Sequence, residues 1–115
     1  MKELVSINIP TYNSEKTLRK CLDAVKLQTY KNMEIVIADS YSKDKTLKIA
    51  KEYECKIVLC EGGLLESRIA GAKKSKGKYI LLLDSDQILH PTVIERALKE
   101  MKEKDYLWFY ERAYN

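Results

Sequence analysis

The fold of this chain is decided at residues 79–86, YILLLDSD, where an apolar run ends in two carboxylates separated by one small residue. A short apolar run between polar flanks is typical of a strand that is buried on both faces of a parallel sheet. Open parallel sheets bind ligands beyond the carboxyl ends of their strands, so Asp84 and Asp86 are expected at that edge. Because residues i and i+2 of a strand share a face, both carboxylates are predicted to converge on one Mg²⁺ or Mn²⁺ ion.

The same acidic tripeptide also has a purely structural interpretation. Asp-Ser-Asp is common in polar turns, where its side chains cap the following helix by accepting hydrogen bonds from backbone N–H groups. On the tripeptide alone, a metal site and a helix cap are both open.

Strands and helices are predicted to alternate on both sides of this stretch. Apolar segments predict strands at residues 4–9, 33–38, 56–60, 79–84 and 106–110. Helices are predicted after the capping residues Ser14 and Asp44, over residues 64–74, and from Pro91 onward. Pro10 is expected to end the first strand. The alternation predicts an α/β fold of Rossmann-like type, with three α/β/α layers and a parallel-dominated sheet.

Length and composition bound the class of protein. With 115 residues, 45% of them apolar, the chain is expected to form one domain, residues 1–115. The three cysteines, Cys21, Cys55 and Cys60, lie in apolar segments, which predicts buried thiols in a reducing compartment. No apolar run approaches the roughly 20 residues of a membrane-spanning helix, and no secretory h-region is present. These features predict a soluble, cytoplasmic protein.

The formal charge of +4 is spread over many lysines and glutamates, with a denser basic patch at residues 73–78. This patch lacks interleaved aromatic residues, so nucleic acid is not expected as a partner. The mild basic bias is compatible with anionic ligands and with peripheral contact at a membrane surface.

Four polar clusters are expected to meet at the carboxyl edge of the predicted sheet, namely residues 10–13, residues 39–40, Arg68 and residues 84–86. Together they have the chemistry of a nucleotide pocket. A tyrosine face can stack a base, a carboxylate can accept a base N–H, an arginine can neutralise phosphate, and an acidic pair can hold a divalent ion. Neither a dinucleotide-binding G-x-G-x-x-G nor a P-loop is present. Taken singly, residues 10–13 are better explained as a turn, Asp39 as a loop cap and Arg68 as an exposed helix residue.

The order and spacing of these clusters resemble the family-2 glycosyltransferases of the GT-A, nucleotide-diphospho-sugar type. IPTYN at residues 9–13 resembles the P-x-Y-N opening of that family. IADSYSKDKT at residues 37–46 is similar to its V-D-D-G-S-T-D-G-T loop. SRIAG at residues 67–71 and GKYILLLDSD at residues 77–86 are similar to its A-R-N-x-G and G-x-Y-I-x-x-L-D-x-D motifs. The resemblance covers nearly the whole chain.

The resemblance implies a glycosyltransferase whose donor is a nucleoside diphosphate sugar and whose acceptor is not readable from the sequence. It implies that Pro10, Thr11 and Tyr12 flank the nucleoside. Asp39 would bind the base. No catalytic residue is assigned, because the part of the family that supplies the acceptor site and the general base has no match here.

For the other end of the donor, the resemblance implies that Arg68 approaches the nucleotide phosphates. Asp84 would lie near the ribose or a metal-bound water, and Asp86 would be the direct metal ligand. A bound Mn²⁺ or Mg²⁺ would stabilise charge on the departing nucleoside diphosphate.

Several residues depart from the family pattern. Ser40 stands where the family often has a second aspartate, Tyr41 where it has glycine, Ile69 where it has asparagine, and Gln87 where a further aspartate is common. These departures bear on the fine geometry of the base and ribose contacts.

Three alternatives stay open. One is a non-catalytic or truncated nucleotide-sugar-binding module, since nothing in this sequence matches the acceptor-binding half of the family. Another is a haloacid-dehalogenase-like phosphatase, whose first motif is also an apolar strand followed by D-x-D. The third concerns assembly: the aromatic segment at residues 106–110 is expected to form an exposed edge strand, which predicts a homodimer.

Overall fold

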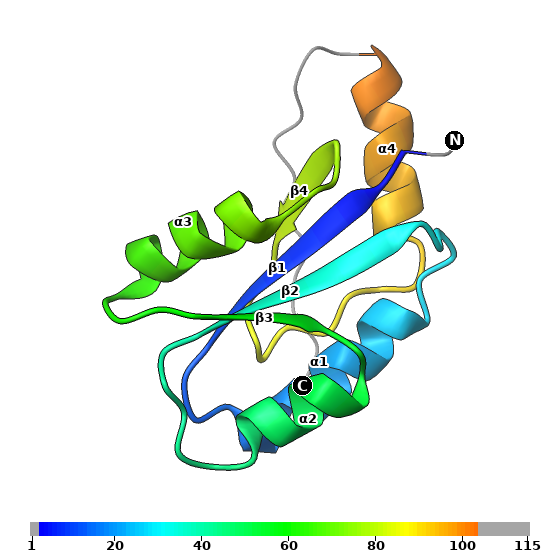
Figure 1. Ribbon diagram of the computed structural model, residues 1–115. Helices are drawn as coiled ribbons and strands as arrows, with labels where there is room; N and C mark the ends of the chain where they lie inside the picture. The colour runs from blue at the N-terminus through cyan, green and yellow to red at the C-terminus, as the bar shows by residue number, and fades with distance from the viewer. Residues whose placement is uncertain (1–2, 104–115) are drawn as a thin grey trace.

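The computed structural model describes residues 3–103, in which four parallel strands are covered by helices (Figure 1). The strands are β1 (Val5–Thr11), β2 (Met33–Asp39), β3 (Lys56–Leu59) and β4 (Tyr79–Leu82), in the spatial order β3-β2-β1-β4. The helices are α1 (Glu15–Lys26), α2 (Thr46–Glu52), α3 (Leu64–Lys74) and α4 (Val93–Glu103). The predicted α/β class and parallel sheet are confirmed. The expected fifth strand at residues 106–110 lies outside the described residues.

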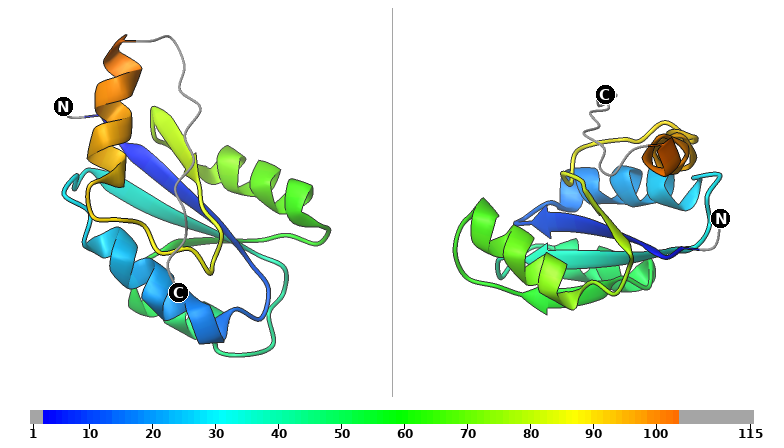
Figure 2. Two further views of the ribbon diagram at one scale, coloured as in Figure 1. Left: turned by 180° about the vertical axis from the view of Figure 1, so that it is seen from behind. Right: turned by 90° about the horizontal axis from the view of Figure 1, so that it is seen from above.

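The strand order explains which face each helix covers. From β1 to β3 the chain moves across the sheet in one direction, and from β3 to β4 it moves back past β1. Right-handed crossovers place helices on opposite faces when the direction reverses. Accordingly, α1 and α4 lie on one face of the sheet and α3 lies on the other (Figure 2). None of the helices in this part of the chain has the length and apolar composition needed to cross a membrane.

The main core lies on the face covered by α1 and α4. Alternate residues of β1, namely Val5, Ile7 and Ile9, point into it and are buried. The α1 residues expected inward are all buried there, namely Leu18, Cys21, Leu22 and Val25. α4 adds Val93, Ile94 and Leu98. This core holds the helix that follows β1 against the sheet and so fixes where that helix begins.

Pro10 does not end β1, contrary to the prediction from sequence. The strand continues to Thr11, and Pro10 stands opposite Ala38 of β2. Residues 8 and 10 of β1 turn their backbone groups toward β4, as the hydrogen bond from Leu83 N–H to the Asn8 carbonyl shows. β4 pairs with β1 only as far as Asn8, so position 10 lies beyond the last pair of this ladder, and the Leu83 carbonyl accepts from Arg68 instead. The missing proline donor therefore costs the sheet nothing.

Within residues 3–103, β4 lies at the edge of the sheet and is buried on one face only, which corrects the prediction of a strand buried on both faces. Tyr79 and Leu81 pack against the core, but Ile80 and Leu82 are 45% and 54% exposed. The apolar run therefore covers one buried face and one face that α3 leaves open in the described part of the chain. Period-2 burial is typical of such half-covered strands, and a continuous apolar run does not reveal it.

The cysteines are reduced, and two of them have strongly raised pKa values. Cys21 is buried in the core, whereas Cys55 and Cys60 are partly buried. Burial away from water raises the pKa of the Cys21 and Cys55 thiols to about 12. These two thiols therefore stay protonated at neutral pH and act as packing groups.

Glu34 of β2 ties three segments together on the α3 side of the sheet. Its carboxylate accepts hydrogen bonds from the Ser6 hydroxyl at 2.5 Å and the Lys76 N–H at 2.6 Å, and it pairs with Lys56 Nζ at 2.6 Å. Partial burial alone would raise its pKa. The bonds to Lys56, Lys76 and Ser6 outweigh burial and lower the pKa of Glu34 to about 2.

Replacing Glu34 with glutamine is expected to lower the free energy of unfolding by about 2 kcal/mol at pH 7. Because the folded pKa is lowered from 4.5 to about 2, the carboxylate stabilises the fold above pH 4.5 and stops doing so as the pH falls to about 2. Urea unfolding at pH 7 and near pH 2 measures this. The control is Glu52→Gln, whose ion pair with Arg19 is exposed and should change stability little at either pH. An equal effect of Glu34→Gln at both pH values would contradict the account.

Candidate functional site

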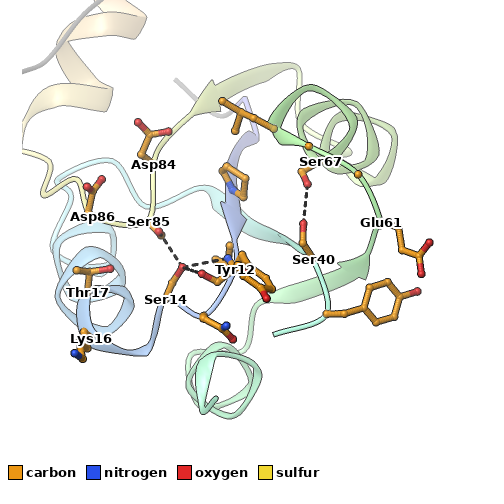
Figure 3. A pocket seen from close by; sticks show the side chains of 17 residues that line it. Tyr12, Ser14, Lys16, Thr17, Ser40, Glu61, Ser67, Asp84, Ser85 and Asp86 are labelled. Carbon is orange, nitrogen blue, oxygen red and sulfur yellow. Dashed lines mark hydrogen bonds between the residues drawn. The ribbon is translucent and has the colours of Figure 1, made fainter. Parts of the chain in front are cut away.

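A cavity of about 930 Å³ opens at the carboxyl ends of the strands, where the sequence predicted a ligand site (Figure 3). It is lined by residues 10–14, 16–17, 40–41, 61–64, 67 and 84–86. These segments follow β1, β2, β3 and β4, so every strand of the described sheet contributes a loop. Because β2 and β4 flank β1 and are reached by crossovers on opposite faces, the cavity lies at a topological switch point of the sheet.

Asp39 holds together two of the loops at this edge. It is fully buried at the end of β2. Its Oδ1 accepts hydrogen bonds from the Thr11 hydroxyl and the Ser42 hydroxyl, both at 2.6 Å, and its Oδ2 accepts one from the Ser42 N–H at 2.8 Å. Asn13 adds two bonds between the same loops, with its N–H donating to Ser42 Oγ and its Oδ1 accepting from the Lys43 N–H, each at 2.8 Å. The β1 and β2 loops therefore form one unit.

Two residues of this unit have left-handed backbone conformations. Asn13 has φ 47° and Tyr41 has φ 59°. Asparagine tolerates this region, but a bulky side chain there is an outlier that costs on the order of 1–2 kcal/mol. Tyr41 is the position where the family pattern has glycine, so the structure explains that preference. Here the chain keeps a tyrosine in a conformation that favours glycine.

Arg68 of α3 reaches across the end of the sheet to Asp84. The guanidinium Nη2 pairs with Asp84 Oδ1 at 2.6 Å, and Nη1 lies 3.4 Å from the carbonyl oxygens of Asn8 and Leu83. The Arg68 side chain is 19% exposed and that of Asp84 is 55% exposed. The arginine is thus anchored on strand-end carbonyls and fixes the position of the more exposed carboxylate.

The acidic tripeptide forms a turn after β4. The Gln87 N–H donates to the Asp84 carbonyl at 3.0 Å, and the Gln87 side chain accepts from the Asp84 N–H at 2.7 Å. Ser85 Oγ bonds to Ser14 Oγ at 3.2 Å, which ties the turn to the beginning of α1. The cap interpretation is wrong, because α4 begins only at Val93. The strand-face argument also does not apply, since β4 ends at Leu82 and both carboxylates lie beyond it.

The Asp86 carboxylate accepts no hydrogen bond and forms no ion pair within residues 3–103, and it lines the cavity. Figure 3 shows Asp84 and Asp86 on one side of the cavity and Glu61 on the other. Among the described residues that line it, these three carry carboxylates, and Lys16 carries an ammonium group. A bare anion would therefore meet mostly negative charge in this cavity.

The residues present fit a divalent ion whose remaining coordination positions are filled by the phosphates of a ligand. In the described residues, no three carboxylate, histidine or cysteine side chains come together to hold a metal by themselves. Mg²⁺ and Mn²⁺ are commonly held by one or two carboxylates together with substrate phosphates. The unpaired Asp86 and the exposed Asp84 meet that description.

The structure brings five of the seven predicted site residues into the wall of the cavity. These are Pro10, Thr11, Tyr12, Asp84 and Asp86. The other two lie behind the wall, each bonded to a lining residue: Asp39 to Thr11, and Arg68 to Asp84. In this structure they position other groups rather than face the cavity.

Sequence reasoning missed several lining residues. Lys16 and Thr17 come from the first turn of α1, and Glu61 precedes α3. A helix that follows a parallel strand begins at the carboxyl edge, so the first turn of α1 could have been predicted there. Ser67 also lines the cavity, with its hydroxyl 3.3 Å from that of Ser40. No sequence signal singled out Glu61, and Ser67 stood out only as the first residue of the SRIAG segment at residues 67–71.

Comparison with known proteins gives one family match and a set of relatives. The family model described as "Glycosyl transferase family 2" matches residues 6–113. The chain is 33% identical to the glycosyltransferase GlyG of Streptococcus pneumoniae serotype 4 over 112 residues. The matched region covers 91% of this chain and 37% of GlyG. The chain spans about a third of the length of the first curated relatives it matches.

Solved structures share the fold. TarS 1-349 of S. aureus superposes with a TM-score of 0.81 at 30% identity, covering 86% of this chain and 32% of TarS. TarS has also been solved with UDP and with UDP-GlcNAc. Glucosyl-3-phosphoglycerate synthase of Mycobacterium tuberculosis, solved with Mn²⁺, UDP and glucosyl-3-phosphoglycerate, has a TM-score of 0.73 at 22% identity and covers 86% of this chain and 39% of that protein.

Proposed function

This chain belongs to glycosyl transferase family 2, and we propose that it binds a metal-chelated nucleoside diphosphate sugar in the cavity at the strand ends. The activity we propose is transfer of the sugar to an acceptor whose class neither sequence nor structure identifies. Membership of this family replaces the haloacid-dehalogenase-like alternative that the D-x-D motif raised.

One observation carries the proposal: residues from separate sequence motifs line a single cavity. Tyr12 comes from the first motif and Asp84 and Asp86 from the last, about 70 positions later in the chain. A cavity of about 930 Å³ is in the range of small-molecule sites and accommodates a nucleotide sugar. The relatives solved with UDP and UDP-GlcNAc support a nucleotide-sugar donor.

The charge of the cavity supports a divalent metal. A diphosphate entering beside Asp84 and Asp86 would be repelled unless a cation stood between the anions. Asp86 would hold the ion directly, and Arg68 would keep Asp84 in place beside it. When bound, Mn²⁺ or Mg²⁺ would supply Lewis-acid stabilisation of the departing diphosphate. The solved neighbour that contains Mn²⁺ and UDP supports this cofactor class.

The part of the cavity lined by Thr11 and Tyr12 would hold the nucleoside. Tyr12 is 60% exposed and offers a ring face to a base. Thr11 lines the cavity and is fixed by Asp39, so in this structure Asp39 acts as a positioning residue for the nucleoside end. Asp39 is fully buried, so direct contact between its carboxylate and a base would require the residues that cover it to move.

We propose that residues 1–115 form one nucleotide-sugar-binding unit. The inverting transfer needs a base that deprotonates the acceptor hydroxyl, and we assign that role to no residue here. Because the chain spans about a third of its relatives, a donor-binding module that acts with further polypeptide is the second candidate. The predicted homodimer and cytoplasmic location stay predictions.

Thermal unfolding of the full chain against UDP, GDP, ADP and CDP, each with Mn²⁺ and with EDTA, tests the proposed donor class. One nucleotide is expected to raise Tm by about 10 °C at 100-fold excess over its Kd, and only with Mn²⁺. Stabilisation by none of them, or equal stabilisation in EDTA, would contradict metal-chelated donor binding. Sugar transfer or donor hydrolysis by the chain alone would separate the enzyme from the binding module.

A further inference from the structure

We propose that Tyr41 is a specificity-determining residue whose ring, together with that of Tyr12, forms the aromatic surface that receives the base of the nucleotide. This inference rests on the proposed function and names the part of the ligand that the residue recognises. A nucleotide would be selected over other metal-bound phosphates because it alone carries a planar base.

The backbone at Tyr41 is the first observation behind this inference. A φ of 59° is unfavourable for tyrosine, and glycine would adopt it without strain. Strained residues that persist in a fold are concentrated at ligand sites, where the side chain that causes the strain is needed. Tyr41 lines the cavity, which places the strain at the candidate site.

The surrounding hydrogen bonds hold Tyr41 in this conformation. The next residue, Ser42, is fixed from two sides by Asp39, through its N–H and its hydroxyl. Asn13, the residue that follows Tyr12, donates its backbone N–H to Ser42 Oγ in the same loop. The two tyrosines therefore stand on adjacent strand ends, β1 and β2, in loops that are bonded to each other.

Both tyrosines line the cavity and are exposed. Tyr41 is 50% exposed and Tyr12 is 60% exposed, so each has an uncovered surface. Neutral rings suit a base better than a diphosphate, and the acidic side of the cavity at residues 84–86 suits the metal-bound diphosphate better than the base. Stacking of one base on an aromatic side chain corresponds to about tenfold or more in affinity.

The test compares binding of UDP, GDP, ADP, CDP and inorganic pyrophosphate in Mn²⁺ by calorimetry, for the wild type and four variants. Tyr41→Gly and Tyr41→Asn remove the ring but keep residues that tolerate the left-handed conformation. Tyr41→Phe keeps the ring. Glu54→Gly is the matched control, because Glu54 has the same backbone conformation, φ 58°, and does not line this cavity.

Tyr41→Gly is expected to raise the Tm of the ligand-free protein by about 4 °C while weakening the preferred nucleoside diphosphate about tenfold. Tyr41→Asn should weaken the nucleotide equally, and neither variant should change pyrophosphate binding. Tyr41→Phe should bind like the wild type. Glu54→Gly should raise Tm to a similar extent without changing the affinity for any ligand.

Three results would overturn the inference. If the wild type binds a nucleoside diphosphate but Tyr41→Gly and Tyr41→Asn bind it as tightly, Tyr41 has no part in recognition and the proposed function stands. Equal weakening of nucleotide and pyrophosphate would assign Tyr41 a general structural role. If the wild type binds none of the nucleotides, the proposed function fails and the inference fails with it.

Discussion

Asp86→Asn is expected to abolish the metal-dependent part of nucleotide binding. The substitution keeps the size of the side chain and removes the negative charge that a divalent ion needs. Because Asp86 has no hydrogen bond or ion pair within residues 3–103, its loss should leave the Tm of the ligand-free protein within about 2 °C of the wild type. Calorimetric titration with the preferred nucleoside diphosphate should show an affinity about 100-fold lower in Mn²⁺ and no change in EDTA.

The matched control for this variant is Glu61→Gln. Glu61 lines the same cavity on its other side, so the substitution removes one negative charge from the cavity without touching the predicted metal ligands (Figure 3). It should preserve the Mn²⁺ dependence. If Glu61→Gln lost that dependence to the same degree as Asp86→Asn, the effect would reflect the net charge of the cavity, and Asp86 would not be the metal ligand.

Asp39→Ala is expected to weaken binding of the nucleoside part of the donor whether or not metal is present. The substitution leaves the Thr11 hydroxyl and two donors of Ser42 without their acceptor inside the protein. Stability should fall by about 3 kcal/mol, and the loops that carry Tyr12 and Tyr41 should no longer be held together. Binding of the matching nucleoside monophosphate, measured in EDTA and in Mn²⁺, should weaken about tenfold in both.

Thr11→Val gives a milder version of the same change, because it removes one of the three bonds to Asp39 and keeps the shape of the side chain. It should show the same pattern with a smaller amplitude. Asp23→Ala, an exposed carboxylate bonded to Tyr53, is the control and should leave nucleotide binding unchanged. An effect of Asp39→Ala that appears only in Mn²⁺ would place Asp39 at the metal and would contradict its role as a positioning residue.

Most of the fold could be predicted because the local signals and the tertiary structure agree. The apolar periodicity of α1 and the alternation of strands and helices each pointed to the arrangement observed. The errors concern features that depend on neighbours. Pro10 is tolerated because the β1–β4 ladder ends before it, and Ile80 and Leu82 are exposed because α3 leaves that face of β4 open within residues 3–103. Neither fact is present in the local sequence.

The candidate site could be predicted as a set of strand ends but not as a set of contacts. Parallel strands bring their carboxyl ends to one edge, which is why Tyr12 and Asp86 could be expected at the same cavity. Sequence does not say which polar groups face the cavity and which lie one hydrogen bond behind it. Asp39 and Arg68 have partners that are distant in sequence, 28 and 16 positions away, and these partners determine where each side chain points.

The central claim is that a metal-bound diphosphate sits beside residues 84–86 with its nucleoside toward Tyr12. The most direct measurement is the amide NMR spectrum of the full chain with its preferred nucleoside diphosphate, first in Mg²⁺ and then with Mn²⁺ in its place. Resonances of residues 12, 40, 41 and 67 should shift with nucleotide, and Mn²⁺ should broaden those of residues 84–86 most strongly. Broadening centred elsewhere, or nucleotide shifts away from the strand ends, would contradict the account.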